Sequence, residues 1–265
     1  MPTVKLTEPF SGEITMKKIN SYGEISPLVM KYLKKGVITN CFVSPGAYMH
    51  EIAEGRLFCD YSEDFLIFYF LRDDFYIMYF YAANENAVFP HTDKKLICEV
   101  SDKNLKAAEN NSFKKTVTRV KYELLNNKST FPSALRDFPS VAPEDVFSLM
   151  SKSFDKYTAY LPTYSELCTD CEKKLIIPEF SGDTLSGALR FEQKGKNACI
   201  KHLCVDEKFR NAGIGKKLIN KFLALSHDKN CFVFTGEENT AARHLYESAG
   251  FSLSGEKSFV YERKN

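Results

Sequence analysis

The residues best suited to chemistry surround a glycine-containing turn in the last third of the chain. An apolar run, Ile200–Val205, predicts a strand, and Lys216–Ser226 carries apolar side chains at helical spacing. Between them, Arg210–Gly215 has the sequence RNAGIG. Glycines at a strand-to-helix turn let a ligand approach the backbone and leave N–H groups unpaired at the helix start. With the positive end of the helix dipole, these donors predict a seat for phosphate or pyrophosphate.

A second segment, Asn239–Phe251, predicts a helix that asparagine begins and Gly250 ends, with Tyr246 in its last turn. A dinucleotide-binding loop of the Rossmann type is an alternative for the glycine turn. That loop requires Gly-x-Gly-x-x-Gly and an acidic residue about 20 positions later. Here Arg210 occupies the place of the first glycine, and the later element is a helix containing a tyrosine. The sequence therefore disfavours the Rossmann interpretation.

Three blocks in this order resemble the GNAT superfamily of acyl-CoA-dependent N-acyltransferases. They are Leu203-Cys-Val, then Arg210-x-x-Gly-x-Gly, then the segment Asn239–Phe251, and together they cover about residues 200–251. The resemblance implies that acetyl-CoA is the acyl donor. It also implies a mixed, strongly bent sheet flanked by helices.

The resemblance assigns a role to each matching residue. The amide of Leu203 would contact the acyl carbonyl, and the backbone of Val205 would pair with the pantetheine arm. Asn239 would hydrogen-bond that arm, and Tyr246 would protonate the leaving sulfur. The pyrophosphate would be held by the turn and the start of the helix: Arg210, Asn211, Ala212, Gly213, Ile214, Gly215 and Lys216.

Each assignment has a simpler alternative. Tyr246 is also suited to a core position with its hydroxyl bonded to a backbone carbonyl. Asn239 is a helix N-cap in either case. Arg210 and Lys216 are also suited to be ordinary surface charges, because backbone amides alone can bind phosphate.

The sequence does not identify a general base. Strict alternation along the strand places Lys201 and Cys199 on the face of Leu203, and neither suits a base. His202 falls on the opposite face, which favours a structural histidine, although a bulge would reverse this parity. Carboxylates offer further candidates: Glu192, Glu237 and Glu238.

Composition limits the class of protein. The chain has 265 residues, 44% of them hydrophobic, and 36 basic against 34 acidic residues, so we expect neither nucleic acid nor a membrane as partner. The N-terminus has no signal-peptide pattern, and the apolar segment Phe65–Tyr81 contains charges and is too short to span a bilayer. Eight cysteines then predict reduced thiols and a cytoplasmic location. Cys168 and Cys171 lack partner ligands, so we expect no metal site.

Patterning predicts an α/β fold with two domains, residues 1–128 and 140–265. Asn126–Val141 carries two prolines and little periodicity and forms the expected junction. In the first domain we expect a strand over Glu13–Asn20 and helices beginning at Ser26-Pro27 and Ser44-Pro45. Further strands are expected at 56–61, 65–71, 75–82, 96–100 and 116–124.

In the second domain we expect helices from Pro143 and, with a Thr163-x-x-Glu166 capping box, through Lys174. Strands are expected at 175–180, 185–193, 198–205 and 231–235, and a final hairpin at 251–253 and 258–262. The first domain has a similar outline without the glycine turn. Two interpretations remain open: a degenerate GNAT-like copy without a CoA site, or an unrelated α+β domain.

The sequence therefore predicts an N-acyltransferase that moves an acetyl group from acetyl-CoA to an amine of a small molecule or peptide. A non-catalytic acyl-CoA sensor is the alternative, motivated by the absence of a base at positions 199 and 201. A purely structural interaction protein is a third hypothesis. The aromatic strands of the first domain predict a sheet core, with a substrate pocket as the alternative. The sequence leaves the acceptor amine and the oligomeric state open.

Overall fold

The computed structural model describes residues 16–33, 36–132 and 137–264. The chain divides into two compact units, residues 1–115 with 261–265, and residues 116–260. The boundaries expected from the sequence, 1–128 and 140–265, leave the strand at 114–124 in the first domain. In the structure most of this strand belongs to the second unit, because it pairs with strands of that unit. Among the described residues, no helix is long and apolar enough to cross a membrane.

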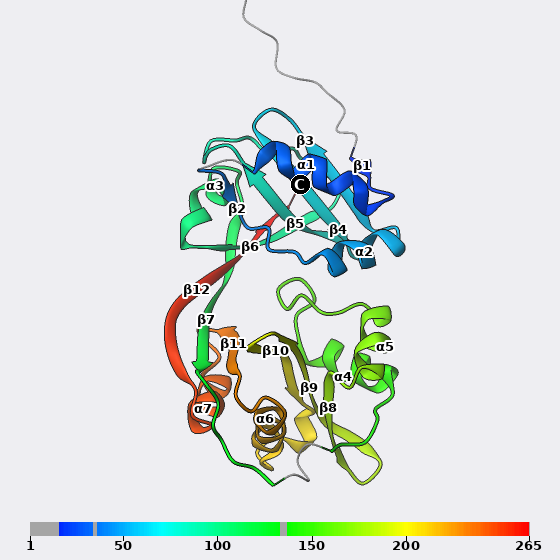
Figure 1. Cartoon of the computed structure of the whole chain (residues 1–265), viewed down its shortest axis with the longest axis vertical. Coiled ribbons are helices and arrows are strands. Elements are labelled where there is room, and N and C mark those ends of the chain that lie inside the picture. Colours follow the sequence, from blue (N-terminus) through cyan, green and yellow to red (C-terminus); the bar gives the residue numbers. More distant parts are fainter. Residues whose placement is uncertain (1–15, 34–35, 133–136, 265) are drawn as a thin grey trace, which may run out of the picture. The chain divides into compact units, whose positions relative to one another are not determined.

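The N-terminal unit contains a sheet with the strand order β1-β3-β4-β5-β6, and β2 pairs with β5. Helices α1 and α2 lie over one face of it (Figure 1). The rings of Phe68 and Phe70 pack edge-on against Tyr48 of α2, with ring centroids 5.2 and 5.8 Å from that of Tyr48. The aromatic strands therefore build a core, as expected. The elements are β1 Lys17–Lys18, α1 Ile25–Tyr32, β2 Ile38–Thr39, α2 Pro45–Ala53, β3 Leu57–Tyr61, β4 Phe65–Leu71, β5 Phe75–Ala82, β6 Lys95–Ser101 and α3 Leu105–Glu109.

Local signals at the N-terminus were partly misleading. The first helix was expected to begin with Ser26 as cap, but it begins at Ile25, because a capping box between Ser21 and Glu24 already turns the chain before it. At α2 the expectation is confirmed, since the Ser44 hydroxyl accepts from the Ala47 amide at 3.3 Å. The strand expected at 13–20 is limited to β1 among the described residues, and residues 13–15 lie outside them.

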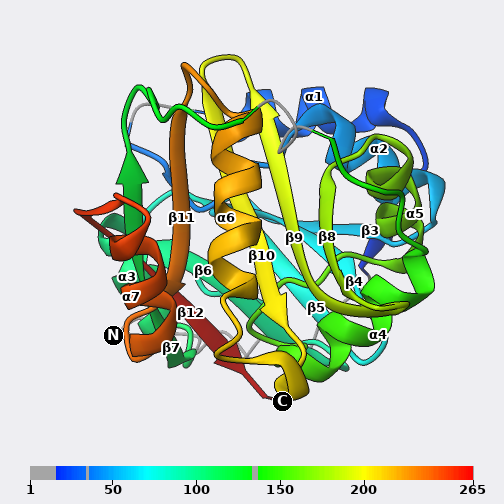
Figure 2. The same ribbon diagram turned by 90° about the horizontal axis from the view of Figure 1, so that it is seen from below.

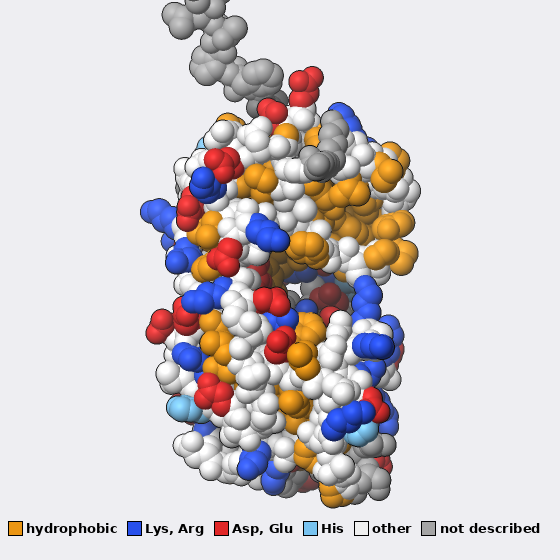
Figure 3. Space-filling view, turned by 60° about the vertical axis from the view of Figure 1, so that its left-hand side comes forward, with side chains coloured by type: hydrophobic (Ala, Val, Ile, Leu, Met, Phe, Trp, Pro, Cys, Tyr) orange, Lys and Arg blue, Asp and Glu red, His pale blue; other side chains and the backbone are white. Residues whose placement is uncertain are grey.

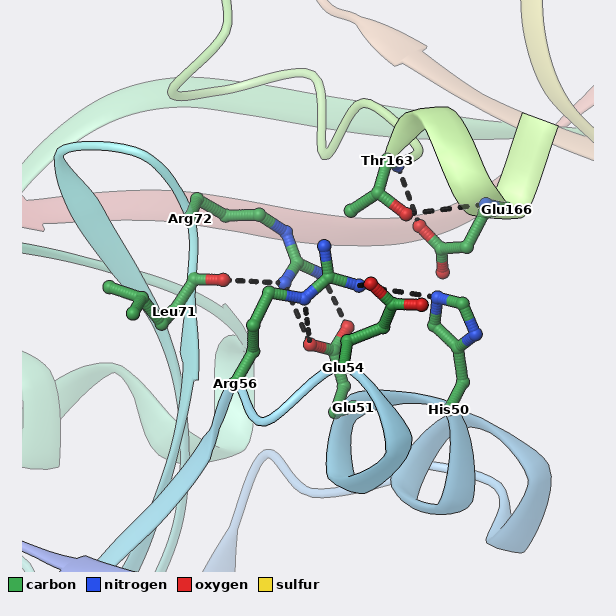
Figure 4. Close-up of polar contacts among 8 residues, drawn as sticks. All are labelled: His50, Glu51, Glu54, Arg56, Leu71, Arg72, Thr163 and Glu166. Atoms are coloured by element: carbon green, nitrogen blue, oxygen red, sulfur yellow. Dashed lines mark hydrogen bonds and ion pairs between the residues drawn. The ribbon is translucent and has the colours of Figure 1, made fainter. Parts of the chain in front are cut away.

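Two arginines converge on one buried glutamate of α2 in the N-terminal unit (Figure 4). Glu51 is 2% exposed and accepts two hydrogen bonds from Arg72, at 2.8 and 3.0 Å. Arg56 Nε lies 3.3 Å from the same carboxylate, and His50 Nε2 lies 3.2 Å from Arg56 Nη2. These contacts join α2 to the chain preceding β3 and to the β4–β5 turn.

The C-terminal unit contains the strands β12-β7-β11-β10-β9-β8 in this order. Helix α6 lies along β9 and β10 (Figure 2), and α4 and α5 pack in a separate cluster with β8, β9 and β10. The capping box of α5 between Thr163 and Glu166 is present as expected. The elements are β7 Lys114–Leu124, α4 Pro143–Ser153, α5 Tyr164–Glu172, β8 Ile176–Ser181, β9 Thr184–Lys194, β10 Asn197–Val205, α6 Ile214–Leu225, β11 Asn230–Gly236, α7 Thr240–Ser248 and β12 Ser252–Arg263.

The expected C-terminal hairpin is wrong. Residues 252–263 form one continuous strand, β12, although Gly255 has a positive φ of 85°. Ser252 Oγ donates to the Glu123 carbonyl, and Lys121 Nζ lies 2.7 Å from a Glu256 carboxylate oxygen. Pairing with β7 therefore keeps the segment extended where local sequence favours a turn.

Basic and acidic side chains are interspersed over the face shown in Figure 3. This distribution agrees with the net charge of +2. Hydrophobic side chains gather on part of the N-terminal unit in that view. Exposed large hydrophobic residues of this unit include Met30, Leu33, Phe42 and Met49.

Candidate active site

Strand β10 contains an irregularity at Lys201. Its antiparallel register with β9 shifts between Ile200, opposite Phe191, and His202, opposite Arg190. An extra residue in a strand reverses the side-chain alternation beyond it. Accordingly Ile200, before the shift, and Leu203, after it, both pack in the core under α6.

This bulge corrects the expected face of Leu203. Strict alternation grouped Leu203 with Lys201 and Cys199, whereas the structure groups it with Ile200 and Ala198. Both of these residues are apolar, so the strand still offers no base on that face. His202 follows the bulge together with Leu203, and it therefore stays on the opposite side of the strand.

The parallel pairing of β10 with β11 is short. It joins residues 197–200 to residues 230–233 and extends no further among the described residues. Beyond it, β11 continues to Gly236 in pairing with β7, while β10 continues to Val205 in pairing with β9. The edge of β10 at Leu203–Val205 that faces β11 is therefore left without a strand partner. Such an edge can accept an extended ligand as if it were another strand.

The turn after β10 is exposed and conformationally specialised. Asn211 and Gly213 have positive φ values of 63° and 78°. Asp206 caps a short 3-10 turn at 207–209, and α6 begins at Ile214. In the part of the chain that the structure describes, no acceptor is found for the N–H groups of residues 211–216. The turn therefore presents unpaired donors at the positive end of a helix, the arrangement that binds phosphate groups.

Two glycines allow α6 to lie close to the sheet. A Cβ atom on Gly187 of β9 would lie 2.8 Å from Ile214 Cγ2 and 3.1 Å from the Cys204 carbonyl oxygen. A Cβ atom on Gly215 would lie 3.0 Å from a methyl group of Leu245 and 3.9 Å from one of Leu203. The start of α6, the end of β10 and helix α7 therefore meet at one place.

The sequence analysis missed Gly187 and Leu245. A glycine within the apolar segment LSGAL of β9 was an available signal, because glycine in a strand often marks the close approach of another backbone.

Tyr246 follows Leu245 in α7 and is 5% exposed. Its ring centroid lies 6.2 Å from that of Tyr122 and 5.9 Å from that of Phe251. Burial raises the pKa of its phenol, so the proton is retained at neutral pH. The bond to a backbone carbonyl expected for a plain core tyrosine is not present, since its hydroxyl has no hydrogen-bond partner among the described residues.

The neighbouring Tyr122 is held from α7 itself. Its hydroxyl donates to a Glu247 carboxylate oxygen at 2.6 Å and accepts from Arg243 Nε at 3.1 Å. These bonds fix the ring against which Tyr246 packs.

The remaining predicted cofactor residues are exposed or half-buried. Asn239 is exposed and caps α7, its side-chain oxygen accepting from the Ala242 amide at 3.1 Å. Arg210 and Lys216 are exposed on either side of the turn. Leu203 and Val205 are half-buried against the α6 core.

The candidate bases all have other partners or surroundings. His202 is 5% exposed, its Nε2 lies 2.9 Å from the Ala159 carbonyl oxygen, and its ring contacts Phe154. Burial lowers the pKa of His202 to about 4. Glu192 lies 3.9 Å from Lys201, and Glu237 pairs with Lys257 at 2.7 Å. Glu238 is exposed.

The sequence of the C-terminal unit matches a known protein family. Residues 140–251 match the model of the acetyltransferase (GNAT) family. This part of the chain is a GNAT acetyltransferase domain. No curated protein matches the chain significantly in sequence.

Solved structures extend the fold likeness to nearly the whole chain. A GCN5-related N-acetyltransferase from Sphaerobacter thermophilus matches with a TM-score of 0.54 and 10% identity, over 94% of this chain and 95% of that one. An acetyltransferase of the GNAT family from Colwellia psychrerythraea matches with a TM-score of 0.52 and 16% identity, over 95% and 100%. A Pyrococcus horikoshii protein matches with a TM-score of 0.58 and 11% identity, over 99% of this chain and 93% of that one.

The N-terminal unit is therefore also GNAT-like in fold, which favours the GNAT-like interpretation over an unrelated α+β domain. In the GNAT domain the parallel strands β10 and β11 are connected by the glycine turn and α6. The corresponding parallel strands of the N-terminal unit, β5 and β6, are connected by residues 83–94, which contain no helix. The connection between these strands in the N-terminal unit thus has no counterpart of the glycine turn and α6.

Proposed function

We propose that this protein transfers an acetyl group from acetyl-CoA to a primary amine of a small molecule or peptide. The observation that carries the proposal is the exposed turn at 210–213, whose unpaired amides lie at the start of α6 and directly after the open edge of β10. A diphosphate on those amides and an extended arm along β10 would bring a thioester toward Leu203.

The donor supplies a thioester, whose acyl carbon an amine can attack. In this step a C–N bond forms, the C–S bond breaks and a thiolate departs. Main-chain N–H groups near the acyl oxygen stabilise the negative charge that develops on it, and the amide of Leu203 is the proposed donor. Tyr246 would give its phenolic proton to the departing sulfur. Its hydroxyl bonds to no described residue, which leaves it free to donate and supports this role.

The proton of the attacking amine has no assigned acceptor in the chain, so we propose that it leaves through water. The eight cysteines are all free thiols, which supports the reducing environment of the cytoplasm as the site of action.

A non-catalytic acyl-CoA sensor is the second candidate. One observation favours it: the residues sharing the face of Leu203 on β10 are apolar, so no base accompanies the thioester.

Turnover distinguishes the two candidates. The protein is incubated with acetyl-CoA and a panel of amines, and free thiol is measured. We expect amine-dependent thiol release that falls about 100-fold in Tyr246→Phe, with binding of CoA retained. The exposed Tyr22→Phe serves as matched control. Tight binding of acetyl-CoA without thiol release for any amine would establish the sensor.

Binding itself is tested at the turn. Gly213→Val should abolish CoA binding, because its φ of 78° disfavours a β-branched residue and the amides of the turn would shift. Gly182→Val, at an exposed β8–β9 turn with a φ of 60°, imposes similar strain elsewhere in the same unit. Undiminished affinity in Gly213→Val would contradict the proposed seat.

A further inference from the structure

The N-terminal unit carries a cavity on the sheet face that its helices leave uncovered. Phe58 is directly opposite Tyr69 across β3 and β4, and Tyr76 is directly opposite Leu71 across β4 and β5. Opposite residues in antiparallel strands share a face, so these three aromatic side chains lie together. Tyr48 of α2 packs on the alternate residues of β4 and therefore on the other face.

The connector between β5 and β6 explains why part of this face is open. In the GNAT domain the equivalent connection supplies α6, which packs along the sheet. In the N-terminal unit residues 83–94 supply only an irregular segment, anchored by Phe89, whose ring contacts Phe65 and Phe80. A cavity of about 470 Å³ remains, and it is lined by Met16, Phe58, Tyr76, His91, Thr92 and Asp93.

The lining combines aromatic rings with a carboxylate. The centroid of Tyr76 lies 6.4 Å from that of Phe58 and 5.7 Å from that of Tyr69. The Tyr76 hydroxyl donates to Asp93 at 3.3 Å, which directs the carboxylate toward the rings. The side chain of Asp93 is 69% exposed, and among the described residues the one cation that pairs with it is Lys94, at 3.8 Å.

A further carboxyl group lies on the same face of the sheet. Asp60 lies two residues from Phe58, and no Lys or Arg pairs with it in the described part of the chain. Burial raises the pKa of its carboxyl, as expected for a carboxylate without a cation. The Tyr69 hydroxyl nearby is buried without a hydrogen-bond partner.

We propose that this cavity binds a small organic cation, an amine or quaternary ammonium with a short apolar body. The positive group lies over the rings of Phe58 and Tyr76 and replaces Lys94 beside Asp93. Cations are attracted to the negative faces of aromatic rings, and partial desolvation strengthens the attraction. The thioether of Met16, which is polarisable and adaptable, contacts the apolar body. The site is independent of acyl transfer, since it uses residues of the N-terminal unit alone.

The test compares three probes of one shape in the full-length protein without acetyl-CoA: phenethylammonium, neutral 2-phenylethanol and anionic 3-phenylpropionate. Binding is measured by calorimetry, and the methyl resonance of Met16 is followed by NMR to locate the site. We expect the cation to bind and shift the Met16 resonance. The alcohol should bind about threefold to tenfold more weakly, and the anion more weakly still.

Two variants remove the two recognition elements separately. Phe58→Leu keeps an apolar side chain but removes the ring, and Asp93→Asn keeps the shape but removes the charge. Each should weaken phenethylammonium binding about threefold to tenfold, while Asp73→Asn in the exposed β4–β5 turn leaves it unchanged. The proposal is overturned if the alcohol binds as tightly as the cation, if both variants keep the original affinity, or if the Met16 resonance does not move.

Discussion

His202 illustrates how burial alone can make one residue sensitive to pH. Its neutral ring lies between Phe154 and the Ala159 carbonyl, and its pKa is about 4 in the folded protein against an ordinary value of 6.5. Below pH 6.5 the His202 ring is therefore protonated in the unfolded chain, whereas in the folded chain it stays neutral until about pH 4. The stability contributed by the neutral ring is complete above pH 6.5 and is lost as the pH falls toward 4, by about 3 kcal/mol in total.

We expect His202→Gln to reduce this acid sensitivity, because glutamine can donate to Ala159 but does not titrate. Urea unfolding at pH 7.5 and pH 5.0 should show a pH-dependent loss about 2 kcal/mol smaller in the variant. His244→Gln, at a side chain that is 85% exposed, is the control. Equal losses in wild type and His202→Gln would contradict the explanation.

The single carboxylate of Glu51 neutralises the positive charge of two arginines, Arg56 and Arg72. Glu51→Gln would leave Arg56 and Arg72 partly buried without their shared anion, and we expect a loss of about 3 kcal/mol in the free energy of unfolding. Glu54→Gln, at a more exposed carboxylate 4.0 Å from Arg56, should cost less than about 1 kcal/mol. Chemical denaturation measures both; similar values for the two variants would mean that the Glu51 network contributes little.

At the scale of elements, the position of α6 depends on the missing side chain of Gly187. Gly187→Ala would place a methyl group 2.8 Å from Ile214 Cγ2, and the first turn of the helix would have to move. We expect a loss of about 2 kcal/mol in stability and at least tenfold weaker CoA binding, measured by denaturation and calorimetry.

The control for this variant is Gly236→Ala. Its added methyl group would meet Asn239 Cβ at 3.8 Å, an ordinary contact. If Gly187→Ala lost stability but kept full CoA affinity, the geometry of the turn would not depend on how closely α6 packs on β9.

For the whole molecule, the last strand contributes residues to both units. Most of β12 belongs to the second unit, but Arg263 near its end is 5% exposed within the first. Its guanidinium donates to the carbonyls of Phe89, Pro90 and Asn111 and lies over the ring of Phe113. It therefore fixes the β5–β6 connector.

Arg263→Met keeps much of the side-chain length but leaves these carbonyls without their donor. We expect a loss of about 3 kcal/mol and faster proteolysis within residues 83–94, with Lys264→Met as the exposed neighbouring control. Unchanged proteolysis of this segment in Arg263→Met would show that the connector is held by other contacts.

Local chemistry of the chain determined much of this protein. The caps at Ser44 and Thr163, the turn at Arg210–Gly215 and the apolar spacing of α6 each depend on residues a few positions apart, so the sequence alone predicts them. The same local motifs predicted the GNAT domain, and phosphate binding by its glycine turn stays a prediction.

Tertiary structure alone decided the features that depend on distant partners. The bulge at Lys201 is defined by the pairing of β10 with β9. The extended course of β12 depends on its pairing with β7. Gly187 is required because α6, which is distant in sequence, packs against it. The residues that share the face of Leu203 on β10, and the hydrogen-bond partners within reach of the Tyr246 hydroxyl, also depend on distant parts of the chain. The physical reason is that strand register and close packing are set by the element lying alongside, which the local sequence does not contain.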